Sequence, residues 1–109
     1  MDRVAHFTRL VAEQPGNDLF RFSLAQALVG AGRPLEAEPH FRACANAKLD
    51  WMIPRIALGK ILLQSGRAAE AKPVLEDALQ LAIDQHHEDP ESEVRGLLAE
   101  IAASDGTPR

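Results

Sequence analysis

The chain has 109 residues and a net charge of −4, with 46% hydrophobic and 26% charged residues. This length fits one domain, and the scattered Lys and Arg residues form no basic cluster of the kind that binds nucleic acid. No apolar run approaches the roughly 18 residues that span a bilayer, and the N-terminal segment lacks the apolar core of a secretory signal, so we expect a cytoplasmic protein that binds neither nucleic acid nor membranes.

The sequence repeats itself with a period of 34 residues. Shifted by this amount, Gly32 coincides with Gly66 and Arg33 with Arg67. Further matches in the same register are Leu24 with Leu58, Ala25 with Gly59, Leu28 with Leu62, Glu36 with Glu70, Ala37 with Ala71, Pro39 with Pro73, Phe41 with Leu75, and Cys44 with Ala78. A period of this length is typical of stacked supersecondary units.

Each unit is predicted to be a helix hairpin, because an apolar stripe, a glycine and a second apolar stripe follow one another. Gly32 and Gly66 stand where the first helix ends, in the left-handed conformation that glycine adopts at little cost. Small residues of the two stripes should let the paired helices approach closely. Pro39 and Pro73 fall about a turn and a half into the second helices, where proline bends the axis and costs about 3 kcal/mol.

This order of large, small, large, glycine, alanine, large and small residues resembles the tetratricopeptide repeat, over most of the chain. The resemblance implies an all-α fold, a right-handed superhelix of antiparallel helix hairpins with about six helices. Arg21 and Arg55 depart from it, since the family usually has a large apolar residue there. The resemblance implies one domain over 1–103, with a half repeat at 2–14 and full repeats at 18–51 and 52–85. The residues that follow predict a capping helix at 90–103 and a disordered tail at 104–109.

The capping helix has its own start signal. Asp89 is predicted as the N-cap, with Pro90 at the first helical position and Glu91 in the first turn. Its apolar residues share one face at helical spacing, which suits a terminal helix that covers the preceding ones. They are Val94, Leu97, Leu98 and Ile101.

The first helices of the two full repeats are apolar on a second side as well as on the core side. In tetratricopeptide repeats this second side lines a concave groove, so the resemblance implies a groove that binds a peptide or a partner helix. The alternative is that the C-terminal helix fills the same trough and buries these residues as ordinary core. The predicted groove residues are Phe22, Gln26, Val29, Ile53, Ile56, Lys60 and Leu63.

Other polar residues give weaker signals. His6 and His40 are one period apart, but two imidazoles without a third ligand make a poor metal site, and surface histidines are the simpler interpretation. The acidic residues of 84–93 are expected first to stabilise a turn and a helix start, and only second to bind a basic partner. Cys44 is expected to be a buried small hydrophobe. Trp51 is expected to pack at the turn between the repeats, and the alternative is an exposed Trp that anchors a partner.

The sequence contains no Ser-His-Asp spacing, no glycine-rich phosphate loop and no paired catalytic carboxylates, so we expect no enzyme activity, no cofactor and no resident metal. The leading hypothesis is a protein-protein interaction adaptor. The alternative is a structural module that self-associates as a homodimer, because so short an array leaves its ends uncovered.

Overall fold

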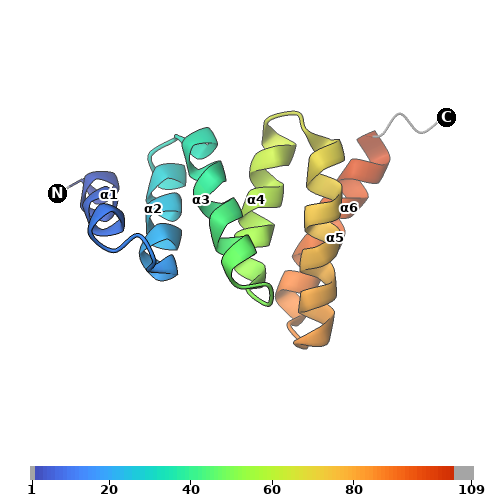
Figure 1. Ribbon diagram of the computed structural model, residues 1–109. Helices are drawn as coiled ribbons and strands as arrows, with labels where there is room; N and C mark the ends of the chain where they lie inside the picture. Colours follow the sequence, from blue (N-terminus) through green and yellow to red (C-terminus); the bar gives the residue numbers. More distant parts are fainter. Residues whose placement is uncertain (1, 105–109) are drawn as a thin grey trace. The chain divides into compact units, whose positions relative to one another are not determined.

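The computed structural model describes residues 2–104, which form six helices and no strand, so the predicted all-α class is confirmed (Figure 1). Ser104 is the last helical residue, and the rest of the predicted tail lies outside the described residues. Within the described part of the chain, no helix combines the length and apolarity needed to cross a membrane. The helices are α1 (Arg3–Glu13), α2 (Asp18–Gly30), α3 (Pro34–Ala47), α4 (Met52–Gln64), α5 (Ala68–Asp84) and α6 (Glu88–Ser104).

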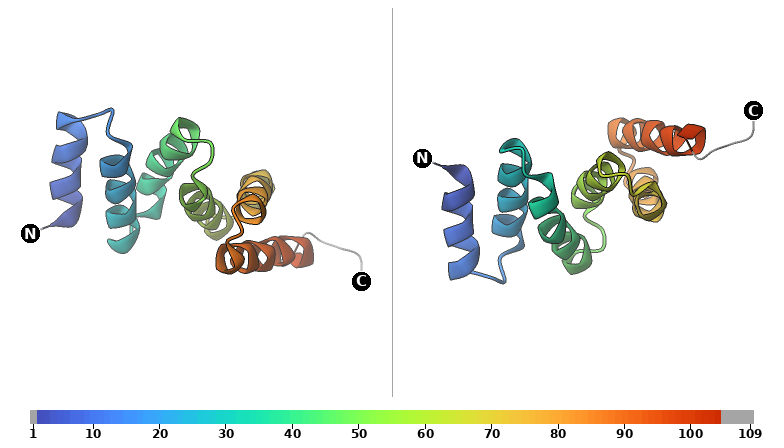
Figure 2. Two further views of the ribbon diagram at one scale, coloured as in Figure 1. Left: turned by 90° about the horizontal axis from the view of Figure 1, so that it is seen from below. Right: turned by 90° about the horizontal axis from the view of Figure 1, so that it is seen from above.

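The helices divide into two compact units, Met1–Leu49 and Asp50–Arg109. In the first unit α2 packs against both α1 and α3, and in the second unit α5 packs against both α4 and α6 (Figure 1). Figure 2 shows α5 nearly end-on and α6 from the side, so these two helices cross at an angle. The border between the units lies two residues before the predicted border between 18–51 and 52–85.

The 34-residue repeat in sequence is also a repeat in packing. Residues one period apart are buried in both units, as expected when the two hairpins pack in the same way. The pairs are Leu24 and Leu58, Ala25 and Gly59, Ala27 and Ile61, Leu28 and Leu62, Ala37 and Ala71, Phe41 and Leu75, and Cys44 and Ala78. The burial predicted for Cys44 is therefore confirmed.

The turns after α2 and α4 have the predicted left-handed glycines. Gly32 has φ 76° and Gly66 has φ 78°. The Gly32 N–H donates to the Val29 carbonyl at 3.0 Å, and the Arg33 N–H donates to the Leu28 carbonyl at 2.8 Å. This is the Schellman arrangement, which satisfies carbonyls at the end of a helix and reverses the chain within three residues.

The turn after α5 has the same hydrogen bonds without a glycine. The His86 N–H donates to the Ile83 carbonyl at 3.2 Å, the His87 N–H donates to the Ala82 carbonyl at 2.9 Å, and His86 has φ 59°. A histidine in this conformation is strained, because its Cβ approaches the backbone in a way that glycine avoids. The sequence predicted a turn within 84–93 but not the left-handed residue in it, since the usual signal for that conformation is glycine.

The start of α6 differs from the prediction. The carbonyl of His87 accepts the N–H of Glu91 at 3.0 Å, so His87 occupies the N-cap position that was assigned to Asp89. Asp89 and Pro90 instead lie in the first turn of α6. Proline is tolerated there because the first four N–H groups of a helix have no partner within the helix.

The two internal prolines are accommodated at exposed positions. Pro39 lies inside α3 and Pro73 inside α5, and both are exposed. The carbonyls left without a helical donor belong to Leu35 and Ala69, which are also exposed, so water can bind to them. This exposure lowers the cost that a buried proline would impose on each helix.

Helices α4 and α5 pack closely together at Gly59. A Cβ added at Gly59 would overlap the side chain of Leu75, with the Leu75 Cγ only 2.6 Å away. Leu75 is fully buried, so it has little room to move. At Gly96 in α6, by contrast, an added Cβ would meet nothing within 4 Å.

We therefore expect Gly59→Ala and Gly96→Ala to have opposite effects on stability. Overpacking against Leu75 costs about 1–3 kcal/mol, which exceeds the gain of about 0.8–1.0 kcal/mol from replacing a helical glycine by alanine. Gly59→Ala should therefore lower the free energy of unfolding, whereas Gly96→Ala should raise it by up to about 1 kcal/mol. Urea unfolding measures both, and a stabilising Gly59→Ala would contradict the close approach.

The left-handed turns give a second prediction. Replacing His86 by glycine should raise the free energy of unfolding by about 1 kcal/mol, because glycine adopts this conformation without the Cβ strain. The reverse change, Gly66→Ala, should lower it by a similar amount. Gly16→Ala is the control, since Gly16 has no left-handed φ and an added Cβ would meet no atom. Thermal unfolding measures all three, and a destabilising His86→Gly would show that the histidine side chain is needed at the turn.

Candidate functional site

In the first unit, the predicted groove residues share one face of α2. Phe22 is half-buried, and its ring packs edge-to-face on Phe41 with the ring centroids 5.7 Å apart. Gln26 is exposed, and Val29 keeps 44% of its surface accessible. The accessible part of this face is therefore made by Gln26 and Val29, while Phe22 also contributes to the core of the α2–α3 hairpin.

In the second unit, the equivalent face of α4 is partly covered. Ile53 is 45% exposed and Leu63 is half-buried, but Ile56 is only 5% exposed and offers little surface to a partner. Lys60 forms an ion pair with Glu93 of α6. Helix α6 thus reaches this side of α4 at Lys60 and leaves Ile53 accessible.

The sequence analysis missed one residue of this arrangement. Leu19 lies one period before Ile53, and it is 61% exposed. The face has the same residue spacing in both helices, with positions 19, 22, 26 and 29 in α2 and 53, 56, 60 and 63 in α4. Each set lies on one face of its own helix. The 34-residue period was the signal that could have identified Leu19.

Arg21 and Arg55, the departures from the expected apolar pattern, tie together the helices of their hairpins. One guanidinium nitrogen of Arg21, Nη1, lies 3.3 Å from His40 Nδ1, and Nη2 donates to the Pro15 carbonyl at 3.1 Å. The Nη1 of Arg55 lies 3.8 Å from the Asp77 carboxylate of α5. Polar contacts between the first and second helix therefore replace the apolar packing that these positions would otherwise supply.

His40 is a half-buried imidazole beside a cation. Burial, and then the neighbouring charge of Arg21, lower the pKa of His40 below its ordinary value. His6 lies beside Arg9, with 3.4 Å between His6 Nδ1 and Arg9 Nη2. Each imidazole therefore has a guanidinium next to Nδ1, which is a poor setting for a bound metal cation.

Cys44 has the properties of a packing residue. Its thiol is buried and donates to the Asp18 carbonyl at an Sγ–O distance of 3.6 Å. Burial, and then the charge of Asp18, raise the pKa of Cys44 to about 11. The thiolate, which is the nucleophilic and oxidisable form, is therefore scarce at neutral pH.

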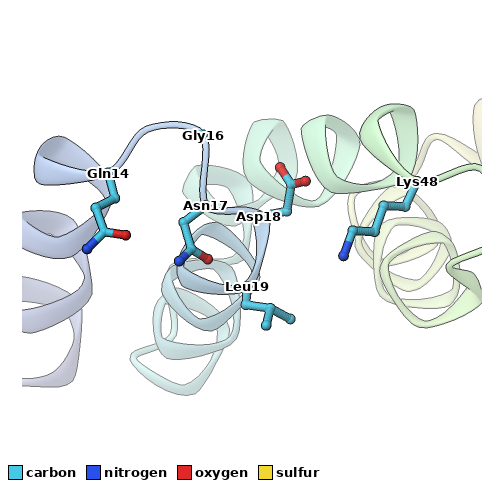
Figure 3. Close-up of a pocket in the computed structure, with 6 residues that line it drawn as sticks. All are labelled: Gln14, Gly16, Asn17, Asp18, Leu19 and Lys48. Carbon is cyan, nitrogen blue, oxygen red and sulfur yellow. The ribbon is translucent and has the colours of Figure 1, made fainter.

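The first unit has an open hollow of about 520 Å³ beside the α1–α2 loop (Figure 3). Figure 3 shows the side chain of Lys48 extending toward the part formed by Asp18 and Leu19. The Asn17 side chain is engaged as the cap of α2, since its Oδ1 accepts the Phe20 N–H at 3.1 Å. This hollow therefore combines one exposed apolar side chain with charges of both signs.

The second unit has a hollow at the equivalent place, where α4 begins. It measures about 220 Å³ and is lined by Trp51, Ile53 and Pro90 among others. A larger hollow of about 580 Å³ adjoins it over the α5–α6 turn, and the two share His87 and Pro90. Sequence reasoning noted Trp51 and the acidic residues separately but did not bring them together.

No family model matches the chain, and no curated protein or solved structure matches it. Within residues 2–104, no group of three or more His, Cys, Asp or Glu side chains is placed to hold a metal ion. The candidate surfaces are therefore the exposed faces of α2 and α4 and the hollows at their N-terminal ends.

The lowered pKa of His40 predicts a pH dependence of stability. As the pH falls through the ordinary histidine value of about 6.5, the unfolded chain takes up a proton that the folded chain resists, so the free energy of unfolding should decrease. Above this value the contribution of His40 to the pH dependence should vanish. Urea unfolding between about pH 7.5 and about pH 5.5 measures the effect.

Two variants identify the cause of this pH dependence. His40→Gln should make the curve flatter, because the titrating group is gone. Arg21→Met should reduce the slope without abolishing it, since burial is the larger cause of the lowered pKa. A slope that is unchanged in His40→Gln would contradict the assignment.

Proposed function

We propose that the chain is a tetratricopeptide-repeat protein that acts as an interaction adaptor and binds a peptide or helix of another protein. The proposal is supported by the 34-residue repeat, the left-handed glycines of its turns, and the burial of equivalent residues in the two units. The buried residues and the glycines of the turns stabilise the hairpins. The exposed side chains are not needed for this packing, so they can contact a partner.

The observation that carries the proposal is the recurrence of exposed apolar residues at equivalent positions. Leu19 and Ile53, one period apart, both remain accessible at the start of the first helix of their unit. Val29 and its equivalent Leu63 also keep exposed surface at the other end of the same face. An isolated exposed Leu is ordinary, but apolar residues that recur on one face are typical of a binding surface.

Polar residues stand between these apolar ones. Gln26 of α2 and Lys60 of α4 are equivalent by the repeat, and both have side chains that can donate hydrogen bonds. A partner segment lying along such a face would bury apolar side chains at both ends and donate or accept hydrogen bonds near the middle. This arrangement suits an extended peptide or one side of a helix.

The exposed face of α2 allows a direct test. We expect the variant Leu19→Glu with Val29→Glu to lose a partner that the native chain retains from a lysate of the source cells. Charges placed in a buried interface should weaken binding more than about tenfold. Quantitative mass spectrometry of the retained proteins measures the difference, and circular dichroism checks that each variant is folded.

Leu35→Glu is the matched control. Leu35 is exposed to the same fraction as Leu19, 61%, but it lies on α3 and its equivalent one period later is Ala69. The control should retain the partner. Equal recovery with the native chain and with the α2 variant would refute binding through this face.

Self-association is the second candidate function. Leu49, at the end of the first unit, is 71% exposed, and a second copy could cover it together with Leu19. Sedimentation over a range of concentrations decides between the two candidates. A constant mass of 11.9 kDa would reject the homodimer, whereas a mass that rises with concentration and falls in Leu49→Glu would support it.

A further inference from the structure

The hollow at the start of α4 has two sides that are held together by a hydrogen bond. The side-chain amide of Gln85, in the α5–α6 turn, donates to the carbonyl of Asp50 at 2.9 Å. Figure 1 shows this turn at the same end of the unit as the start of α4. The N-terminal end of α4 and the turn thus form one surface, although they are about one repeat apart in sequence.

The walls of this surface are apolar. Trp51, Ile53 and Pro90 line the smaller hollow, and Ile83 lines the larger one beside it. Ile53 and Ile83 are 45% and 38% exposed, so they are not needed to complete the core. A small apolar side chain of a partner could enter here and remove these surfaces from water.

The rim of the surface is negatively charged. Between Lys72 and Arg95 the chain contains no Lys or Arg, and three carboxylates of this stretch, Glu88, Asp89 and Glu91, line the larger hollow. Glu91 pairs with Arg95, and Glu93 with Lys60. Asp50 lines the smaller hollow, and no Lys or Arg is among the described residues that line either hollow.

Helix stability explains only part of this charge. Glu88 and Asp89 stabilise the N-terminus of α6, where negative charge is favourable. Asp84 ends α5, where a negative charge opposes the helix dipole and no basic residue balances it in the last turn. The equivalent hollow of the first unit has Lys48 beside Asp18, so an unbalanced negative rim distinguishes the second unit.

We propose that this surface binds a basic segment of a partner protein, in which an apolar residue is flanked by Lys or Arg. The apolar side chain contacts Trp51, Ile53 and Pro90, while the flanking cations lie opposite Asp50, Glu88 and Asp89. The indole of Trp51 also suits a guanidinium group, because cations are attracted to the face of an aromatic ring. The proposal rests on the proposed function and adds the chemistry of the partner.

Trp51 makes the binding measurable without a label. It is the only Trp in the chain, which has no Tyr, so its fluorescence reports on this surface alone. The probes are three short peptides with the same Leu residues, flanked by Arg, by Gln or by Glu. We expect the Arg peptide to shift the Trp51 emission and to bind at least about tenfold more tightly than the Gln peptide, with an affinity that falls as salt is added.

A charge-matched pair of variants tests the assignment to the rim. Glu88→Gln with Asp89→Asn should weaken binding of the Arg peptide by at least about tenfold. Glu76→Gln with Glu100→Gln removes the same net charge from exposed positions that do not line either hollow, and it should bind like the native chain.

Three outcomes would overturn the proposal: no binding of the Arg peptide, equal binding of the Arg and Gln peptides, or equal weakening in the two pairs of variants. Each would reject the basic partner at this surface. None of them would affect the lysate experiment, which depends on Leu19 and Val29 of α2, so failure of this proposal can be distinguished from failure of the proposed function.

Discussion

The closeness of α4 and α5 depends on the absence of a side chain at Gly59. The buried Leu75 fills the space that a Cβ would need, so the distance between the two helices is set at this contact. Two polar contacts also join these helices or the residues next to them. Arg55 of α4 forms an ion pair with Asp77 of α5, and Gln85, just after α5, donates to Asp50, just before α4. Both depend on how closely these helices pack.

The two units use one packing scheme to present different surfaces. Many equivalent positions are buried in both units, yet the hollow at the start of the first helix contains Lys48 and Asp18 in one unit and Trp51 with an acidic rim in the other. Packing restricts the buried positions to residues of suitable size, whereas the residues around the hollows are free to differ. The proposed selectivity for partners therefore depends on these ends of α2 and α4.

The candidate surface could be predicted only in part. Three- and four-residue helical spacing identified seven residues on the second side of α2 and α4, but Leu19, which stands next to the start of its helix, was not among them. Ile56 satisfies the same spacing and is nevertheless buried. The pairing of Lys60 with Glu93 depends on where α6 packs, and nothing in the local sequence of α4 specifies that.

The sequence alone determined the period, the number and order of the helices, the left-handed glycines and most buried positions. These follow from local rules, since helical spacing selects the apolar face and only glycine enters the left-handed region without strain. Tertiary structure decided the strained turn at His86, the start of α6 at Glu88, and the meeting of Trp51 with the acidic turn. Those features depend on contacts between residues distant in sequence, which can override local preference when packing more than offsets the strain.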